Sequence, residues 1–267
     1  MADRNAKGGL SCPLVDLHHV SVRRGGRLAL REVSLTIALG EHVAILGPNG
    51  SGKSTLVKTI CQECYPLPEE GSSVTVFGRQ RWNAAELRKL LGIVANEAGI
   101  SSRPITGREA VLSGYFSSVG LWPHHTVTAA MRERAEEVLE LLEVGHLGDR
   151  RIAEMSSGEI RRILIARALV HDPRALVFDE PSNSLDLFAQ DELRQTMRKL
   201  AHSGIAILLV THHLADIIPE IERVVAMRAG RIVADGRKQE LLTAQSLTRL
   251  FGVGVELARR EGYYHAW

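Results

Sequence analysis

The stretch "GPNGSGKST" (residues 47–55) decides the fold, because it matches the phosphate-binding pattern G-x-x-x-x-G-K-[ST]. An apolar run, "HVAILG", precedes it, and "KSTLVKTICQEC" follows it with apolar residues at helical spacing. A strand, a glycine-rich loop and a helix in this order predict backbone N–H groups that face phosphates at a helix N-terminus. An ordinary glycine-rich turn is the alternative, which the flanking strand and helix disfavour. The residues expected to contact the phosphates are Gly47, Pro48, Asn49, Gly50, Ser51, Gly52, Lys53, Ser54 and Thr55.

Two side chains of this loop have specific expected roles. The Lys53 ammonium would reach the β- and γ-phosphates, and the Ser54 hydroxyl would bind Mg²⁺. The loop by itself does not say what the nucleotide is used for.

A second stretch, "LVFDEP" (residues 176–181), supplies two adjacent acids after an apolar strand. Asp179 would stand at the edge of the sheet, where Mg²⁺ held by Ser54 needs an acidic partner. Glu180 would point elsewhere and could polarise an attacking water as a general base. A solvated turn is the alternative, but a phosphate loop in the same chain favours one nucleotide site built from both stretches.

The pattern of the whole chain indicates its fold class. A chain of 267 residues, 45% of them hydrophobic, can bury one substantial core. Alternating apolar and polar residues in "LVDLHHVSV" and "VSLTIALGEHVAILG" predict half-buried antiparallel strands. From about residue 106 to 170 the spacing is helical, and afterwards strands and helices alternate. This order predicts an α/β core with a helical insertion.

Charge, cysteines and hydropathy narrow the class of partner. The net charge of +2 comes from 33 basic and 31 acidic residues without a long block of one sign, which disfavours nucleic acid. Three cysteines predict a reducing compartment, and the pair in "ICQEC", expected within the helix after the loop, is interpreted as two packed thiols rather than a metal site. No apolar stretch approaches the about 20 residues of a spanning helix, and the N-terminus has no apolar signal core. A cytoplasmic protein is therefore expected.

The order of the motifs resembles the nucleotide-binding subunit of an ATP-binding cassette (ABC) transporter. That order is the phosphate loop, a helical block, "MSSGE", "VFDEP", "SLD" and "VTH", and the resemblance covers about residues 14–236. It implies a P-loop NTPase core, in which a mixed sheet carries an antiparallel β subdomain, and an inserted α-helical subdomain. It implies an ATPase domain over residues 1–240, with the helical insertion at about 97–170, and a tail at 241–267 that packs on the core. ATP and Mg²⁺ are the implied cofactors.

The resemblance also implies that two copies form the complete site. In the family, the signature motif LSGGQ caps ATP held by the opposite subunit, and "MSSGE" (residues 155–159) is its counterpart. The Ser156 hydroxyl and the Gly158 N–H would then contact the γ-phosphate bound by a second copy. Asp186 in "SLD" resembles the loop that communicates across this interface. A head-to-tail homodimer with two ATP molecules is therefore expected.

His212 in "VTHH" resembles the switch histidine that contacts the γ-phosphate, and His213 is the next candidate if the register differs. A polar turn residue is the alternative for a single histidine after a strand. With Lys53 and Glu180, His212 completes the catalytic set that the resemblance implies.

Three departures from the family pattern are visible. Ser157 replaces the first glycine of the signature, and Glu159 replaces its terminal glutamine. The glutamine that touches Mg²⁺ and the membrane partner would fall at Asn96, which is one methylene shorter. The aromatic residue that stacks on adenine would fall at Arg24, whose guanidinium can also stack, although a solvated loop arginine is the alternative. These departures bear on affinity and coupling more than on hydrolysis.

The resemblance implies ATP-driven transport of a small solute, with import favoured, through a separate membrane permease and possibly with a solute-binding protein. The ATPase would then sit on the inner face of the membrane through its permease. The tail resembles those of metal-chelate, siderophore and molybdate-type importers. The alternative is a soluble ABC-type ATPase that acts on ribosomes or DNA; a third possibility is a non-hydrolysing nucleotide sensor, against which the intact Glu180 counts.

Overall fold

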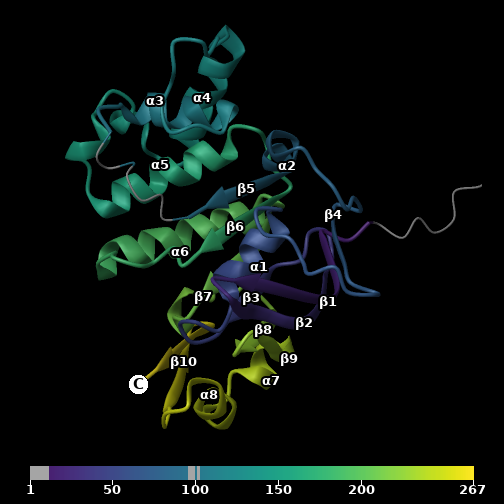
Figure 1. The fold of residues 1–267 in the computed structure, drawn as a ribbon. Coiled ribbons are helices and arrows are strands. Elements are labelled where there is room, and N and C mark those ends of the chain that lie inside the picture. Colours follow the sequence, from purple (N-terminus) through teal and green to yellow (C-terminus); the bar gives the residue numbers. More distant parts are fainter. Residues whose placement is uncertain (1–11, 96–99, 101–102) are drawn as a thin grey trace, which may run out of the picture.

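A six-stranded sheet in the order β5-β6-β7-β3-β8-β9 forms the centre of the molecule (Figure 1). The first five strands of that order run parallel and β9 is antiparallel to β8. This computed structural model describes residues 12–95, 100 and 103–267. The strands are β3 (Val43–Leu46), β5 (Leu91–Val94), β6 (Ala175–Asp179), β7 (Ala206–Thr211), β8 (Arg223–Arg228) and β9 (Arg231–Arg237).

The alternation of side chains along β3 shows how the sheet is buried on both faces. Val43 and Ile45 pack in one hydrophobic cluster, and Ala44 and Leu46 pack in the other. Because successive side chains of a strand point to opposite faces, a strand covered on both sides must be apolar throughout, as "VAIL" is.

One of these clusters lies between the central sheet and a smaller antiparallel sheet. The smaller sheet has the order β2-β1-β4 and consists of β1 (Val15–Arg24), β2 (Arg27–Ile37) and β4 (Ser73–Val76). Helix α1 (Lys53–Ile60) contributes Leu56 and Ile60 to this cluster. The mixed sheet with an antiparallel subdomain confirms the predicted fold class.

The helix after the phosphate loop is shorter than the sequence predicts. It ends at Ile60, Gln62 has a φ of 57°, and the N–H groups of Glu63 and Cys64 both donate to the Lys58 carbonyl. The left-handed residue closes the last turn, as helix C-termini commonly do. The expectation that both cysteines lie in the helix was therefore wrong: Cys61 is its C-cap and Cys64 follows it. Both thiols are free.

The other face of the central sheet is covered by helices. Above it in Figure 1 lie α3 (Gly107–Leu112), α4 (Ala129–Leu141) and α5 (Ser157–Leu169), and α6 (Leu187–His202) lies along the sheet. Helix α3 begins with a capping box, in which Thr106 and Glu109 exchange side-chain and backbone hydrogen bonds. Helix α2 (Ala84–Leu90) leads into β5. No described helix has the length and apolar character needed to cross a membrane.

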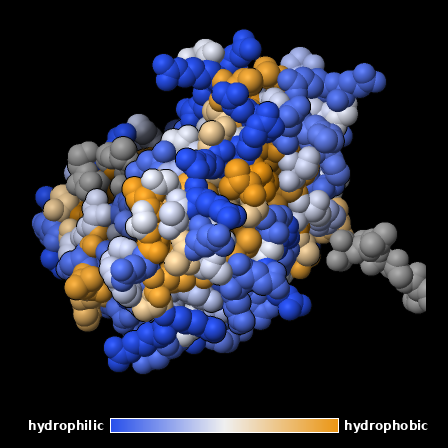
Figure 2. Space-filling model, turned by 90° about the horizontal axis from the view of Figure 1, so that it is seen from below, coloured by the Kyte–Doolittle hydropathy of each residue, from blue (hydrophilic) through white to orange (hydrophobic). Residues whose placement is uncertain are grey.

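The C-terminal residues add one helical turn, one short helix and a hairpin. These are α7 (Lys238–Leu241), α8 (Ala244–Phe251) and the strands β10 (Leu257–Arg260) and β11 (Tyr263–Ala266). Leu247, Leu250 and Tyr264 are buried in the helical-side cluster. Figure 2 views the molecule from this end and shows apolar patches between hydrophilic residues. The exposed Val253 and Trp267 belong to this part of the chain, and the exposed Val233 lies in β9.

Candidate functional site

A cavity of about 450 Å³ opens at the N-terminus of α1. No side chain caps this helix at Gly52, so its first-turn N–H groups are left for a ligand. Partial positive charge at a helix N-terminus makes this cavity suited to an anion such as phosphate. The residues that line it are Leu28, Ala29, Arg31, Asn49, Gly50, Gly52, Lys53, Ser54, Thr55, Glu180, Asn183, Ala229 and Gly230.

The loop conformation depends on glycine at position 52. Gly52 has a φ of +107°, and a Cβ there would lie 2.7 Å from the Ala29 carbonyl oxygen of β2. A side chain would thus be strained by the backbone angle and would collide with a strand. The glycine lets the loop turn tightly into α1.

Lys53 lies at the centre of the cavity wall and is only 5% exposed. Its ammonium donates to the carbonyl oxygens of Gly47 at 2.7 Å and Pro48 at 3.2 Å, and lies 3.2 Å from Glu180 Oε1. The other carboxylate oxygen of Glu180 lies 2.5 Å from His212 Nδ1. Lys53 and His212, which are far apart in the sequence, therefore both contact the carboxylate of Glu180.

Asp179, which ends β6, is the acid beside this set. Its Oδ1 atom is buried and has no hydrogen-bond partner among the residues that the structure describes. Burial and the neighbouring Glu180 carboxylate raise the pKa of Asp179, while Lys53 opposes the shift. An unpaired carboxylate oxygen is the kind of donor that Mg²⁺ takes, so Asp179 fits a hard cation. The exposed hydroxyl of Ser54, which lines the cavity, is a second suitable oxygen; Asp179 adjoins the lining residue Glu180 in the chain but is not itself part of the lining.

A buried aspartate, Asp216, ties together the segments that carry Glu180 and His212. Its Oδ2 accepts hydrogen bonds from Ser182 Oγ at 2.7 Å and from Thr211 Oγ1 at 2.7 Å. Ser182 lies two residues after Glu180, and Thr211 immediately precedes His212. Asp216 is 2% exposed. The sequence reasoning missed it; its signal is a carboxylate four residues after His212, in an otherwise apolar segment.

The signature segment lies outside this cavity. Ser156 is the N-cap of α5 and forms a capping box with Glu159. The hydrogen bond from the Ser156 backbone N–H is the main reason that the pKa of the Glu159 carboxyl is lowered. A Cβ at Gly158 would lie 2.8 Å from Ala189 Cβ, so α5 packs tightly on α6 at this point. Asp186 is the N-cap of α6 and accepts from the Ala189 N–H. None of residues 155–159 lines the nucleotide cavity.

Three other positions singled out in the sequence, Arg24, Asn96 and His213, are not among the described residues that line the cavity. Arg24 ends β1 and is exposed, but it does not line the cavity, whereas Arg31 of β2 does. Asn96 lies outside the described residues. The sequence reasoning did not find the contributions of β2 and of the β8–β9 turn to the cavity, because those residues lie far from the loop in the chain. His213 is exposed, and its ring lies 3.8 Å from the ring of His212.

The family follows from a match to a protein-family model. Residues 30–183, more than half of the chain, match the model described as ABC transporter. The chain belongs to the ABC transporter family. It is an ATP-binding subunit with an ATP-hydrolysing cassette, as the order of its motifs predicts.

Curated relatives include both importers and an exporter. The chain is 32% identical to the uncharacterized ABC transporter ATP-binding protein YlmA of Bacillus subtilis, over 91% of this chain and 93% of the relative. It is 29% identical to the hemin import ATP-binding protein HmuV of Aliivibrio fischeri, over 91% and 92%. It is 32% identical to the Nod factor export ATP-binding protein I of Rhizobium johnstonii, over 89% and 74%.

Solved structures share the fold. A dimeric ATP-binding cassette, MJ0796 bound to ADP and Pi, is 27% identical with a TM-score of 0.68, covering 84% of this chain and 98% of that one. A putative metal-chelate type ABC transporter in an inward-facing conformation has a TM-score of 0.76 at 21% identity, covering 96% and 97%. At that identity the second likeness concerns the fold alone.

Proposed function

We propose that two copies of this chain pair head to tail, hydrolyse Mg·ATP at two shared sites and so drive a separate membrane permease. The observation that carries the proposal is the position of Glu180 between Lys53 and His212, with one carboxylate oxygen near each. A second support is that Ser156 does not line the cavity of its own chain. The Ser156 hydroxyl accepts from the Glu159 N–H and keeps its own proton to donate, so this helix N-terminus can still bind a phosphate held by another copy. The dimeric relative bound to ADP and Pi agrees with this arrangement.

The residues around the cavity divide the work of hydrolysis. The helix N-terminus and Lys53 bind the phosphates, and the ammonium exchanges one of its three present acceptors for a phosphate oxygen. Glu180 is the general base that takes a proton from the attacking water, and His212 orients that carboxylate through its hydrogen bond. Ser54 and Asp179 would hold Mg²⁺, which when bound neutralises charge on the phosphate oxygens. The remaining roles are proposed as the sequence implies them: Arg24 stacks on adenine, Gly158 contacts the γ-phosphate held by the second copy, and Asp186 acts across the interface. Asn96, outside the described residues, is proposed to contact Mg²⁺ and the permease.

The permease is proposed to dock in a groove between the central sheet and the helical region. This groove has a volume of about 400 Å³ and includes Ala95, the residue directly before Asn96 in the chain. Arg88 and Arg167 line it, and so does Glu63, whose carboxylate lies 3.8 Å from the 41% exposed Arg88. Two guanidinium groups and one carboxylate leave the lining with a net positive charge. An acidic or polar segment of a partner suits this groove. Closure of the ATPase dimer would move anything held there.

The direction proposed is import of a small solute, supported by the hemin import relatives. Export is the second candidate, because the Nod factor export relative is as similar to this chain as any importer cited above. A solute-binding protein would accompany an importer only. A position on the inner face of the membrane follows from binding to the permease.

The test of the permease assignment is co-purification in detergent from membranes of the source cells. We expect the tagged chain to bring down one polytopic membrane protein in stoichiometric amount. Arg88→Glu, which reverses a charge in the groove, should reduce that yield at least fivefold, while Arg132→Glu on the exposed face of α4 should not. Recovery of ribosomes or DNA in place of a membrane protein would support the soluble alternative and contradict transport.

A further inference from the structure

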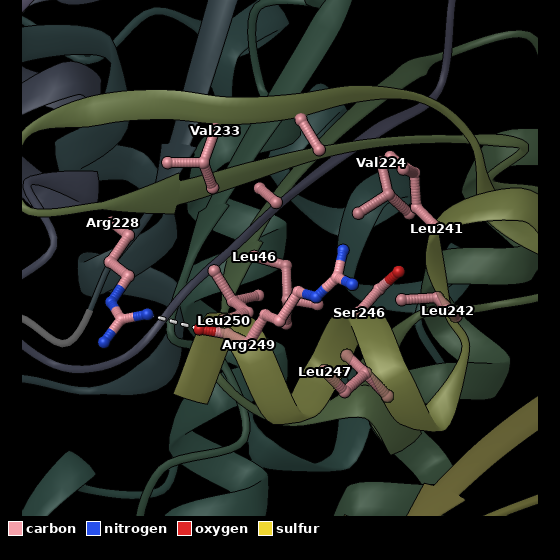
Figure 3. Close-up of a pocket in the computed structure, with 12 residues that line it drawn as sticks. Leu46, Val224, Arg228, Val233, Leu241, Leu242, Ser246, Leu247, Arg249 and Leu250 are labelled. Atoms are coloured by element: carbon pink, nitrogen blue, oxygen red, sulfur yellow. Dashed lines mark hydrogen bonds between the residues drawn. The ribbon is translucent and has the colours of Figure 1, made fainter. Parts of the chain in front are cut away.

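A second cavity lies between helix α8 and the central sheet, apart from the nucleotide cavity. Its volume is about 300 Å³. At about 30 Å³ per water-sized group, this space holds roughly ten non-hydrogen atoms. Strands β3, β8 and β9 form one wall, and α7 with α8 forms the other, and Figure 3 shows side chains of the two walls facing each other. The apolar residues of the lining are Leu46, Val224, Ala226, Val233, Ala234, Leu241, Leu242, Leu247 and Leu250.

The polar groups of this cavity are cationic or can donate hydrogen bonds. Arg249 lines it, and in Figure 3 its side chain runs along α8 toward Ser246. Arg228 also lines the cavity and donates to the Arg249 carbonyl oxygen. Ser246 Oγ accepts from Thr243 Oγ1 at 3.0 Å, which leaves its own hydroxyl proton to donate.

Within the described part of the chain, no carboxylate balances this charge. Among the residues that the structure describes, no acid forms an ion pair with Arg249 or lines this cavity. An apolar space with a guanidinium and a hydroxyl on one side suits a ligand with an aliphatic body and an anionic end. A carboxylate can accept two hydrogen bonds from one guanidinium, and the aliphatic chain would fill the apolar part.

This second cavity shares two structural elements with the nucleotide cavity. The β8–β9 hairpin lines the second cavity with Ala226 and Ala234, and its turn, Ala229 and Gly230, lines the nucleotide cavity. The Gly230 N–H donates to the Ser51 carbonyl oxygen of the phosphate loop at 2.9 Å. On the other side, Leu46 of the second cavity directly precedes the first glycine of that loop.

We propose that this cavity is an effector site for a small aliphatic carboxylate of about eight carbons, and that its occupancy tightens nucleotide binding. A ligand between α8 and the hairpin holds the hairpin against the phosphate loop. The protein then loses less conformational entropy when the nucleotide binds. The coupling is reciprocal, because each ligand must change the affinity of the other by the same factor. The inference rests on ATP binding and is independent of transport.

Direct binding is tested with octanoate as the probe, by titration calorimetry on the purified chain. Octan-1-ol has the same carbon chain without the charge, and we expect it to bind at least tenfold more weakly. Arg249→Gln should weaken octanoate binding about tenfold, whereas Arg237→Gln, which removes the same charge from an exposed site on β9, should leave it unchanged. Ala234→Leu puts a larger side chain into the cavity and should abolish binding. Equal binding of octanoate and octanol, or equal binding by wild type and Arg249→Gln, would overturn the proposal.

The source of the ligand and the coupling are tested in two further titrations. Phosphatidylglycerol vesicles should not displace bound octanoate, and displacement would contradict a freely diffusing ligand. Saturating octanoate should lower the dissociation constant of ADP about fivefold in wild type and not at all in Arg249→Gln. An ADP affinity that octanoate leaves unchanged in wild type would overturn the effector role. Loss of permease binding would leave these results untouched, so the two proposals fail separately.

Discussion

Glu180 Oε2 lies 2.5 Å from His212 Nδ1, and this contact joins the end of β6 to the end of β7. Because the two strands are parallel neighbours, their carboxyl ends meet at one edge of the sheet. Glu180 itself has a φ of 49°, and its N–H donates to the Val210 carbonyl oxygen at 2.8 Å. The carboxylate is thus positioned by backbone as well as by His212.

His212→Gln should slow ATP hydrolysis by about 10²-fold, because Glu180 loses the partner that orients it. The dissociation constant for ATP should change less, since Lys53 and the helix N-terminus still hold the phosphates. Steady-state kinetics on the purified chain measure the rate, and an equilibrium titration with ATP measures the dissociation constant. His213→Gln is the matched control: its ring lies beside that of His212, but it is exposed, and the hydrogen bond to Glu180 belongs to His212. A control as slow as the variant would remove the switch role from His212.

Asp216→Asn should lower the free energy of unfolding by about 2 kcal/mol, because a neutral amide oxygen accepts the hydrogen bonds from Ser182 and Thr211 more weakly than a carboxylate oxygen does. Urea unfolding followed by circular dichroism measures the loss. The control Asp149→Asn, at a side chain that is 90% exposed, should change stability by less than about 0.5 kcal/mol. Equal effects of the two changes would show that the buried network adds nothing.

Asp179→Asn should raise stability and remove activity together. In the absence of Mg²⁺, burial and the charge of Glu180 disfavour the ionised form of Asp179 in the folded chain, and they therefore raise its pKa. The stabilising contribution of its protonated form is present below the unfolded pKa and is lost as the pH rises through the folded value. Calorimetric unfolding in EDTA should show the variant more stable by about 1 kcal/mol at pH 8, with the gain shrinking at acidic pH.

The same Asp179→Asn variant should show no Mg²⁺-dependent ATP hydrolysis above background, because it lacks the proposed carboxylate ligand. Mg²⁺ titrations of ATPase activity in wild type and variant provide the measurement. A variant that is less stable than wild type at pH 8 and still responds to Mg²⁺ would contradict both parts of this account.

Cys61 should resist alkylation while Cys12 reacts. Burial, with a smaller contribution from Glu63, raises the pKa of Cys61 to about 12, and the thiolate is the reactive form. Iodoacetamide at pH 8 followed by mass spectrometry should label Cys12, which is exposed, at least 10²-fold faster. All three cysteines should react in guanidinium chloride. Rapid labelling of Cys61 in the folded chain would show that α1 opens.

The sequence predicted local features and, through the order of its motifs, that Lys53, Glu180 and His212 belong to one site. It did not predict contacts that no motif marks. The loop with Lys53 was predictable because its spacing reflects one backbone shape, and the fold class was predictable because strand and helix patterns differ in period. The hydrogen bonds of Asp216 to Ser182 and Thr211 were not predictable, because these residues come into contact only when the ends of β6 and β7 lie side by side. The end of α1 was placed too late, since the left-handed Gln62 overrides an apolar helical pattern.

Glu180→Gln tests most directly whether ATP is held between two copies of the chain. The amide keeps the shape of the side chain but cannot take a proton from water, so ATP should remain bound. Size-exclusion chromatography with light scattering should show a dimer with Mg·ATP and a monomer with Mg·ADP. The control Glu133→Gln, at an exposed site on α4, should hydrolyse ATP and stay mainly monomeric. A Glu180→Gln chain that binds Mg·ATP tightly and yet stays monomeric would contradict the shared site.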